Sequence, residues 1–101
     1  MKIYISGKIT GLKPEEYHPK FEQAETLLRE KGFQNIVNPT KLGIHPTEDW
    51  TRAMAICMSH LETCDAIYML DSWRESFGAR HELTRAQERR IKVMFGPEDI
   101  N

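Results

Sequence analysis

The chain has 101 residues, of which 40% are hydrophobic and 29% are charged, and its formal net charge is -1. This length favours one domain with a single core, and this composition excludes a disordered chain. A nearly neutral charge argues against binding to duplex nucleic acid, whose phosphates attract basic surfaces. With no apolar run long enough to cross a bilayer and no signal-peptide pattern, we expect no membrane partner and a cytoplasmic location.

The first half of the chain predicts a strand, a helix, a strand and a second helix. Residues 2–6 are largely β-branched or aromatic and are followed by a glycine, which is typical of a strand. A helix is expected to begin at Pro14 and end at Gly32, because apolar residues recur between them at steps of three and four. Residues 33–39 predict a second strand stopped by proline. Thr47 is expected to cap the second helix.

The second half adds a strand, a helix and a strand. Residues 65–70 contain a continuous apolar run, which is typical of a strand buried on both faces. Ser76 is expected to open a third helix that runs to about Arg90, and 91–95 predict the fourth strand. This alternation implies a parallel sheet with right-handed crossovers. We therefore expect one α/β domain over 1–101: a three-layer, Rossmann-like (flavodoxin-like) fold with a four-stranded parallel sheet of order 2-1-3-4 and helices on both faces.

Two cysteines, Cys57 and Cys64, lie seven residues apart in the predicted second helix. Two helical turns separate them by about 10 Å, which is too far for a disulfide, so we expect free thiols. Free thiols also fit a cytoplasmic compartment. His60 lies between them, as in some metal sites. However, both cysteines share an apolar face with Leu61 and no fourth ligand is evident, so no metal site is expected.

Ligands of such sheets bind beyond the carboxyl ends of the strands, at the point where the strand order reverses. Here that point lies between the first and third strands and is flanked by the loops 6–11 and 71–78. Gly7, Lys8 and Asp71 of these loops are therefore candidate substrate-binding residues. The glycine spacing after the first strand does not match a P-loop or a dinucleotide fingerprint, but Lys8 can still offer a donor to a phosphate.

Glu82 in the third helix is the candidate reactive group. Three apolar residues share the face that we place against the sheet: Ala79, Leu83 and Ala86. Glu82 lies about 65° from the centre of that face, at its margin. Because helical side chains lean toward the N-terminus, Glu82 covers Gly78, where backbone N–H groups and Ser76 can hold an anion. The alternative is a surface ion pair with Arg85 or Arg89.

Four motifs resemble the nucleoside 2-deoxyribosyltransferase-like superfamily, and within it a small branch of unknown function from bacteria and phages: IYISGKITG, NP, W...M and CDAIYMLDSW..S.GA..E...A. The resemblance covers nearly the whole chain. The superfamily includes deoxyribosyltransferases and nucleoside-monophosphate N-glycosidases such as 5-hydroxymethyl-dUMP N-hydrolase. The spacing S-x-G-x-x-x-E implies that Glu82 attacks the anomeric carbon, and Tyr4 matches the tyrosine that holds the glutamate. Serine at position 76 implies a 5′-phosphate rather than a free 5′-hydroxyl.

One position departs from the pattern of the hydrolases. They carry a second carboxylate eight residues before the aspartate that begins the third strand. Here that aspartate is Asp65, and the residue eight positions before it is Cys57 instead of a carboxylate. Protonating the departing base is the usual work of such a group, so hydrolysis is slow, uses another acid or is absent. In addition, Lys8 and Thr10 stand where the hydrolases present serine and arginine.

The resemblance implies an N-glycosidase or deoxyribosyltransferase that acts on a (deoxy)nucleoside 5′-monophosphate through a glycosyl ester, without a metal or cofactor. Trp73 or Trp50 would face the base, although packing at the mouth of the sheet explains Trp73 equally well. The alternative is a non-catalytic nucleotide-binding or sensor module, motivated by Cys57. The candidate residues are Glu82 and Tyr4 for catalysis, and Ser76, Gly78, Gly7, Lys8, Trp73 and Asp71 for substrate binding.

The predicted second helix also carries apolar residues beyond its main stripe: Ala53, Ala55, Ile56 and Met58. One sheet face does not need this much apolar surface, so we expect a homodimer through the helix 47–63. The resemblance implies that a neighbouring subunit completes the site. An interaction domain without chemistry is the third alternative.

Overall fold

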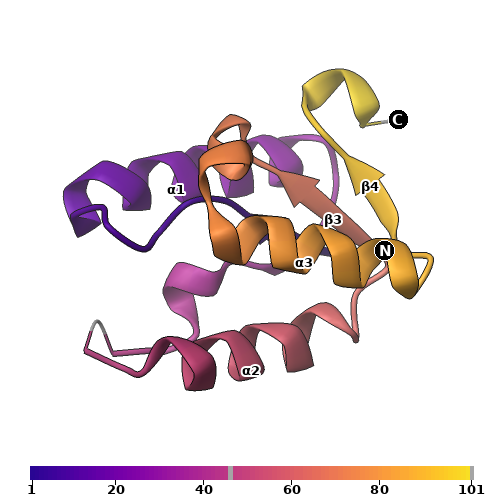
Figure 1. Cartoon of the computed structure of the whole chain (residues 1–101). Coiled ribbons are helices and arrows are strands. Elements are labelled where there is room, and N and C mark those ends of the chain that lie inside the picture. Colours follow the sequence, from indigo (N-terminus) through magenta and orange to yellow (C-terminus); the bar gives the residue numbers. More distant parts are fainter. Residues whose placement is uncertain (46, 101) are drawn as a thin grey trace.

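The structure is a computed structural model, and it describes residues 1–45 and 47–100. Figure 1 shows its helices and strands, which follow one another as β1 (Lys2–Ser6), α1 (Pro14–Glu30), β2 (Asn35–Val37), α2 (Trp50–Leu61), β3 (Ala66–Met69), α3 (Phe77–Glu88) and β4 (Lys92–Met94). Three short 3-10 turns follow strands: η1 (Pro39–Lys41), η2 (Asp71–Glu75) and η3 (Pro97–Asp99). The order of strands and helices is the one that the sequence predicts.

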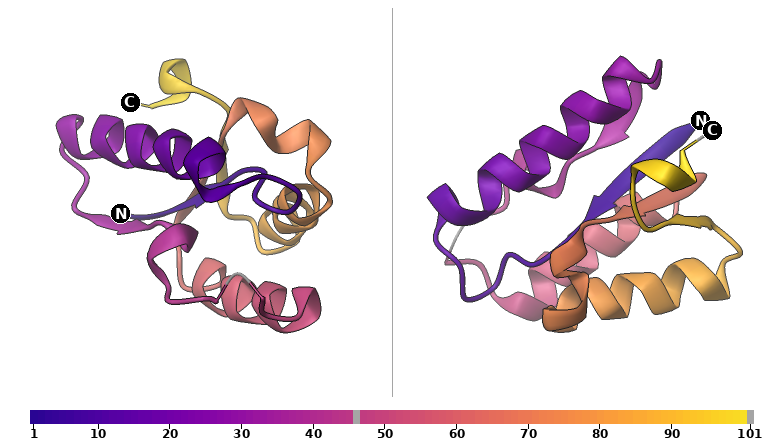
Figure 2. Two further views of the ribbon diagram at one scale, coloured as in Figure 1. Left: turned by 90° about the vertical axis from the view of Figure 1, so that its left-hand side faces the viewer. Right: turned by 90° about the horizontal axis from the view of Figure 1, so that it is seen from above.

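The four strands form one parallel sheet in the order β2-β1-β3-β4, as predicted. Figures 1 and 2 show α2 and α3 on one side of this sheet and α1 on the other. The two hydrophobic clusters follow the same division, because one joins the sheet to α2 and α3 and the other joins it to α1. The predicted three-layer α/β fold is therefore confirmed.

The central strand β1 sends alternate side chains to the two faces of the sheet. Ile3 and Ile5 pack with Phe21 of α1. Tyr4 faces the opposite way and packs in the cluster that includes Cys57 of α2. The strand alternation therefore directs the polar residues of β1 toward α2 and α3.

The start of α2 differs from the prediction. Asp49 caps this helix instead of Thr47, since its carboxylate accepts a hydrogen bond from the backbone N–H of Arg52 at 3.3 Å. Thr47 bonds to the ring of His45 instead, through its backbone N–H at 3.2 Å and its hydroxyl at 2.7 Å. The helix is consequently shorter than the predicted range 47–63.

The third helix begins as predicted. The Ser76 hydroxyl oxygen caps it by accepting a hydrogen bond from the backbone N–H of Ala79 at 3.0 Å. The helix ends at Glu88, two residues before the predicted end, and Arg90 takes a left-handed φ of 58°. A residue in this conformation is a common way to end a helix.

Both cysteines, Cys57 and Cys64, are free and buried. Among the helices of the described residues, none has the length and apolar character needed to span a membrane.

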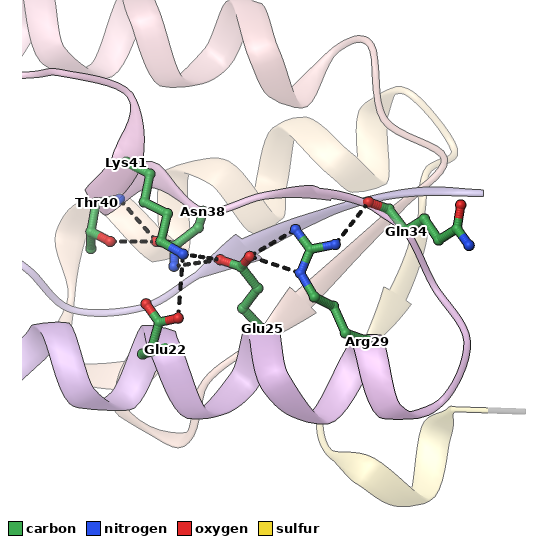
Figure 3. A network of polar contacts seen from close by, with 7 residues as sticks. All are labelled: Glu22, Glu25, Arg29, Gln34, Asn38, Thr40 and Lys41. Carbon is green, nitrogen blue, oxygen red and sulfur yellow. Dashed lines mark hydrogen bonds and ion pairs between the residues drawn. The ribbon is translucent and has the colours of Figure 1, made fainter.

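A buried carboxylate joins α1 to the segment that follows β2 (Figure 3). Glu25 accepts hydrogen bonds from the guanidinium of Arg29 at 2.8 and 3.0 Å and from the Asn38 amide at 3.1 Å, and Lys41 lies 3.0 Å away. Burial acts to raise the pKa of Glu25, but these partners outweigh burial and lower it. The Asn38 amide oxygen also accepts hydrogen bonds from the Thr40 backbone N–H and hydroxyl, which sets the start of η1.

Replacing Asn38 with alanine removes the amide from this network. We expect Asn38→Ala to lower the free energy of unfolding by about 1–3 kcal/mol, because the buried Glu25 and the partly buried Thr40 lose hydrogen bonds. Urea denaturation followed by circular dichroism measures this change. The control is Lys41→Ala: the Lys41 side chain is half exposed, so water can take its place beside Glu25, and we expect a loss of less than about 1 kcal/mol. An equal effect of the two substitutions would contradict the prediction.

Candidate active site

A buried carboxylate lies between α3 and the central strand. This carboxylate belongs to Glu82, which is only 5% exposed. The Tyr4 hydroxyl donates a hydrogen bond to its Oε2 atom at 2.5 Å, and the Ser6 hydroxyl donates to its Oε1 atom at 2.7 Å. Each oxygen of the carboxylate is therefore held by a hydroxyl of β1.

The sequence predicts Glu82 at the margin of the buried face of α3, and the structure buries it fully. The alternative, a surface pair with Arg85 or Arg89, is not what the structure shows. Both arginines bind Glu62 instead, at 2.7 and 3.1 Å. Glu82 is therefore free of basic partners on its own helix.

Ser6 is the residue of this site that the sequence interpretation missed. It is fully buried at the end of β1 and bonds directly to Glu82. The signal that points to it is the strand alternation, because residues two apart lie on the same face and Tyr4 was already assigned to the glutamate.

The protonation of Glu82 is set by its surroundings. Burial raises its pKa from 4.5 to about 7, against the opposing effect of the hydrogen bonds from Tyr4 and Ser6. Burial also raises the pKa of Tyr4 well above 10, with further contributions from Glu82 and Cys57. Tyr4 therefore stays a neutral donor, while Glu82 changes its protonation near neutral pH.

Cys57 of α2 lies beside these groups. Burial raises its pKa to about 11, the Tyr4 hydroxyl lowers it and the Glu82 carboxylate raises it further. The thiol is therefore protonated at neutral pH. This thiol lies near the Tyr4 hydroxyl and the Glu82 carboxylate, and it is a much weaker acid than a carboxyl group.

A cavity of about 530 Å³ opens beside Glu82 at the carboxyl edge of the sheet. Five segments supply its walls, and the polar and aromatic residues among them are Tyr4, Thr10, Tyr17, His18, Phe21, Thr40, His45, Glu48, Trp50, Cys57, Ser76 and Glu82. The residues that line it within the described part of the chain include neither lysine nor arginine. An anion in this cavity would depend on hydroxyl, imidazole and backbone N–H donors.

The structure brings five of the predicted site residues together around this cavity: Tyr4, Gly7, Ser76, Gly78 and Glu82. Both glycines lie close to another side chain. A Cβ atom at Gly7 would lie 2.6 Å from a side-chain carbon of Leu70, and one at Gly78 would lie 3.2 Å from the sulfur of Met54. Trp50, the second tryptophan considered for the base, also lines the cavity.

The other three predicted residues lie outside the cavity lining. Trp73 packs its ring on Phe95, with the centroids 5.7 Å apart. Lys8 donates its backbone N–H to the Ser72 hydroxyl at 3.2 Å. Asp71 is exposed at the start of η2 and borders a smaller pocket between α1 and β3.

The fold and this site define an α/β protein with a parallel sheet and a buried glutamate beside a cavity at the carboxyl edge of the strands. The chain belongs to the family described as domain of unknown function DUF4406, whose model matches residues 1–95. No curated protein and no solved structure matches the chain.

The raised pKa of Glu82 makes stability depend on pH. Because the pKa is 4.5 for the ordinary carboxyl and about 7 in the folded protein, the folded state binds the proton more tightly than the unfolded chain. The resulting stabilisation is present below pH 4.5 and is lost as pH rises to 7, by about 1.4 kcal/mol per pH unit. Glu82→Gln does not ionise, so wild type should lose stability relative to this variant between pH 5 and 8.

Urea denaturation of wild type and Glu82→Gln at pH 5 and at pH 8 measures this difference in stability. Glu88→Gln is the matched control, since Glu88 lies on the same helix with an exposed side chain. A pH dependence that is the same in wild type and Glu82→Gln would show that Glu82 does not titrate in this range.

Proposed function

We propose that the protein cleaves or exchanges the N-glycosidic bond of a (deoxy)nucleoside 5′-monophosphate, with Glu82 as the nucleophile. The observation that supports this most directly is the carboxylate of Glu82, which is buried and held through both oxygens beside a cavity of about 530 Å³. Cavities of this volume are typical of small-molecule sites. A positioned carboxylate is the group that retaining glycosidases use to attack an anomeric carbon.

In the proposed reaction the ionised Glu82 carboxylate bonds to the anomeric carbon. The bond from that carbon to the base breaks, and the base leaves with the electron pair and takes up a proton from a solvent water molecule. Water or a second base then displaces Glu82 from the glycosyl ester, with net retention. Tyr4 and Ser6 hold the carboxylate in one orientation throughout, because each donates to a different oxygen.

The start of α3 is the proposed site for the 5′-phosphate. The Ser76 oxygen accepts from the Ala79 N–H, so its own proton remains available to a ligand. The first N–H groups of a helix have no partner within it, and Gly78 in this first turn of α3 lines the cavity. These donors carry the proposed phosphate contact, since neither lysine nor arginine is among the described lining residues.

The catalytic proposal is tested with a panel of deoxynucleoside monophosphates, in which free base is followed by chromatography. We expect wild type to release a base and Glu82→Gln to release it at least about a thousandfold more slowly, because the nucleophile is lost. Glu88→Gln, on the exposed side of α3, should retain the wild-type rate. Release of base at equal rates by wild type and Glu82→Gln would refute the proposed nucleophile.

A second candidate function is a nucleotide sensor that binds without cleavage, and Cys57 favours it. With a pKa of about 11, the thiol is a poor donor to a departing base. Calorimetry with the same nucleotides separates the two functions. Tight binding of a nucleotide that stays intact for hours would support the sensor, and failure to bind any nucleotide would exclude both functions.

We also propose that two copies associate through α2. Ala55 of this helix is exposed, and Ile56 and Met58 beside it are only partly buried. Light scattering of wild type at micromolar concentration should give twice the monomer mass. Ala55→Glu places a charge on this face and should weaken association at least about tenfold. Thr84→Glu, on the exposed face of α3, is the control, and a monomeric wild type would refute the dimer.

A further inference from the structure

A second pocket lies between α1 and β3, on the side of the sheet that α1 covers. It has a volume of about 380 Å³ and is bordered by residues of α1, β3 and η2 and by Phe95 after β4. Figures 1 and 2 show η3 on this same side of the sheet. None of the described residues that line it also lines the cavity of Glu82. We call it the α1-side pocket.

The buried polar side chain of the α1-side pocket is Tyr68. This residue is 5% exposed, and it packs in the hydrophobic cluster that joins the sheet to α1. No described residue forms a hydrogen bond with its hydroxyl. In the described chain, however, no buried side-chain polar atom is sealed from solvent without a partner, so the hydroxyl opens into the pocket that Tyr68 lines. A buried tyrosine usually pairs its hydroxyl, and this one is left for a ligand.

Three carboxylates lie near this hydroxyl: Glu98, Asp71 and Asp99. Burial raises the pKa of Tyr68, and these groups raise it further, so the hydroxyl stays neutral. None of the three carboxylates forms an ion pair with a described residue. Lys20 is the one basic residue among the described residues that line the pocket, and it is exposed. The surroundings of the hydroxyl therefore carry a negative potential, which attracts a cation.

We propose that the α1-side pocket binds a small organic cation, namely a primary amine with a short apolar body. An ammonium group carries N–H donors and no acceptor, so it donates to the Tyr68 oxygen and to the Asp71 carboxylate together. The apolar body lies along Leu27 of α1 and the ring of Phe95, which is 47% exposed. This site does not depend on the reaction proposed at Glu82, and it gives Asp71 a ligand outside that cavity.

The test titrates the isotopically labelled protein with butylamine, butan-1-ol and butyrate, which share one carbon chain and differ in charge. The backbone amide signals around the pocket are followed by NMR. We expect butylamine to bind at least about tenfold more tightly than the other two, because only its ammonium pairs with Asp71. Asp71→Asn and Tyr68→Phe should each weaken butylamine binding at least about fivefold. Glu75→Gln is the matched control, since it removes the same charge from an exposed residue of η2 outside the pocket lining.

Thermal unfolding separates a ligand-binding role of the Tyr68 hydroxyl from a structural one. Because no described residue bonds to it, Tyr68→Phe should unfold at the same temperature as wild type or at a higher one. A lower unfolding temperature would show that the hydroxyl stabilises the fold and would overturn the argument for a ligand. Equal affinity for butylamine and butan-1-ol would exclude a cation site. The pocket itself would be excluded if butylamine gave no saturable amide shift, or if Asp71→Asn and Glu75→Gln weakened its binding equally.

Discussion

The contact of Glu82 with two hydroxyls of β1 is the constraint around which this structure is arranged. A carboxylate without partners is costly to bury, and here Tyr4 and Ser6 each satisfy one of its oxygens. Both hydroxyls come from the central strand, which pairs with β2 on one side and β3 on the other. Glu82 therefore rests against a strand that is paired on both sides, while most of the cavity wall comes from the segments around it.

The two buried glutamates show how partners decide the role of a side chain. Glu25 faces a guanidinium, an amide and an ammonium group, and its pKa is lowered. Burial raises the pKa of Glu82, because the hydrogen bonds from the neutral hydroxyls of Tyr4 and Ser6 lower it too little to compensate. The first group stays ionised and joins elements together, whereas the second can change its charge near neutral pH. The network of Glu25 also reaches the cavity, because its member Asn38 binds Thr40, which lines the cavity.

The strand order, the layers and the inward position of Glu82 follow from the sequence, because periodicity and chain alternation are local signals. Strand alternation places Ser6 on the same face as Tyr4, but its hydrogen bond to Glu82 depends on how α3 packs on the sheet, which is not a local signal. Both Thr47 and Asp49 can cap α2. In the structure Thr47 bonds to His45, and Asp49 accepts the hydrogen bond from Arg52. The sequence gives no reason to prefer Trp50 over Trp73 as a cavity residue. The structure does, because Trp73 packs on Phe95 and Trp50 lines the cavity.

Cys57 has one further consequence, which concerns the form of a titration curve. Two carboxyl groups that share a pocket exchange one proton between them, and neither has a pKa of its own. Here the neighbour of Glu82 is a thiol whose pKa is about 11. Among Tyr4, Cys57 and Glu82, the carboxyl group is therefore the one that titrates between pH 4 and 9. In this pH range these three residues together behave as a monobasic acid, and their titration curve has one inflection in place of two overlapping ones.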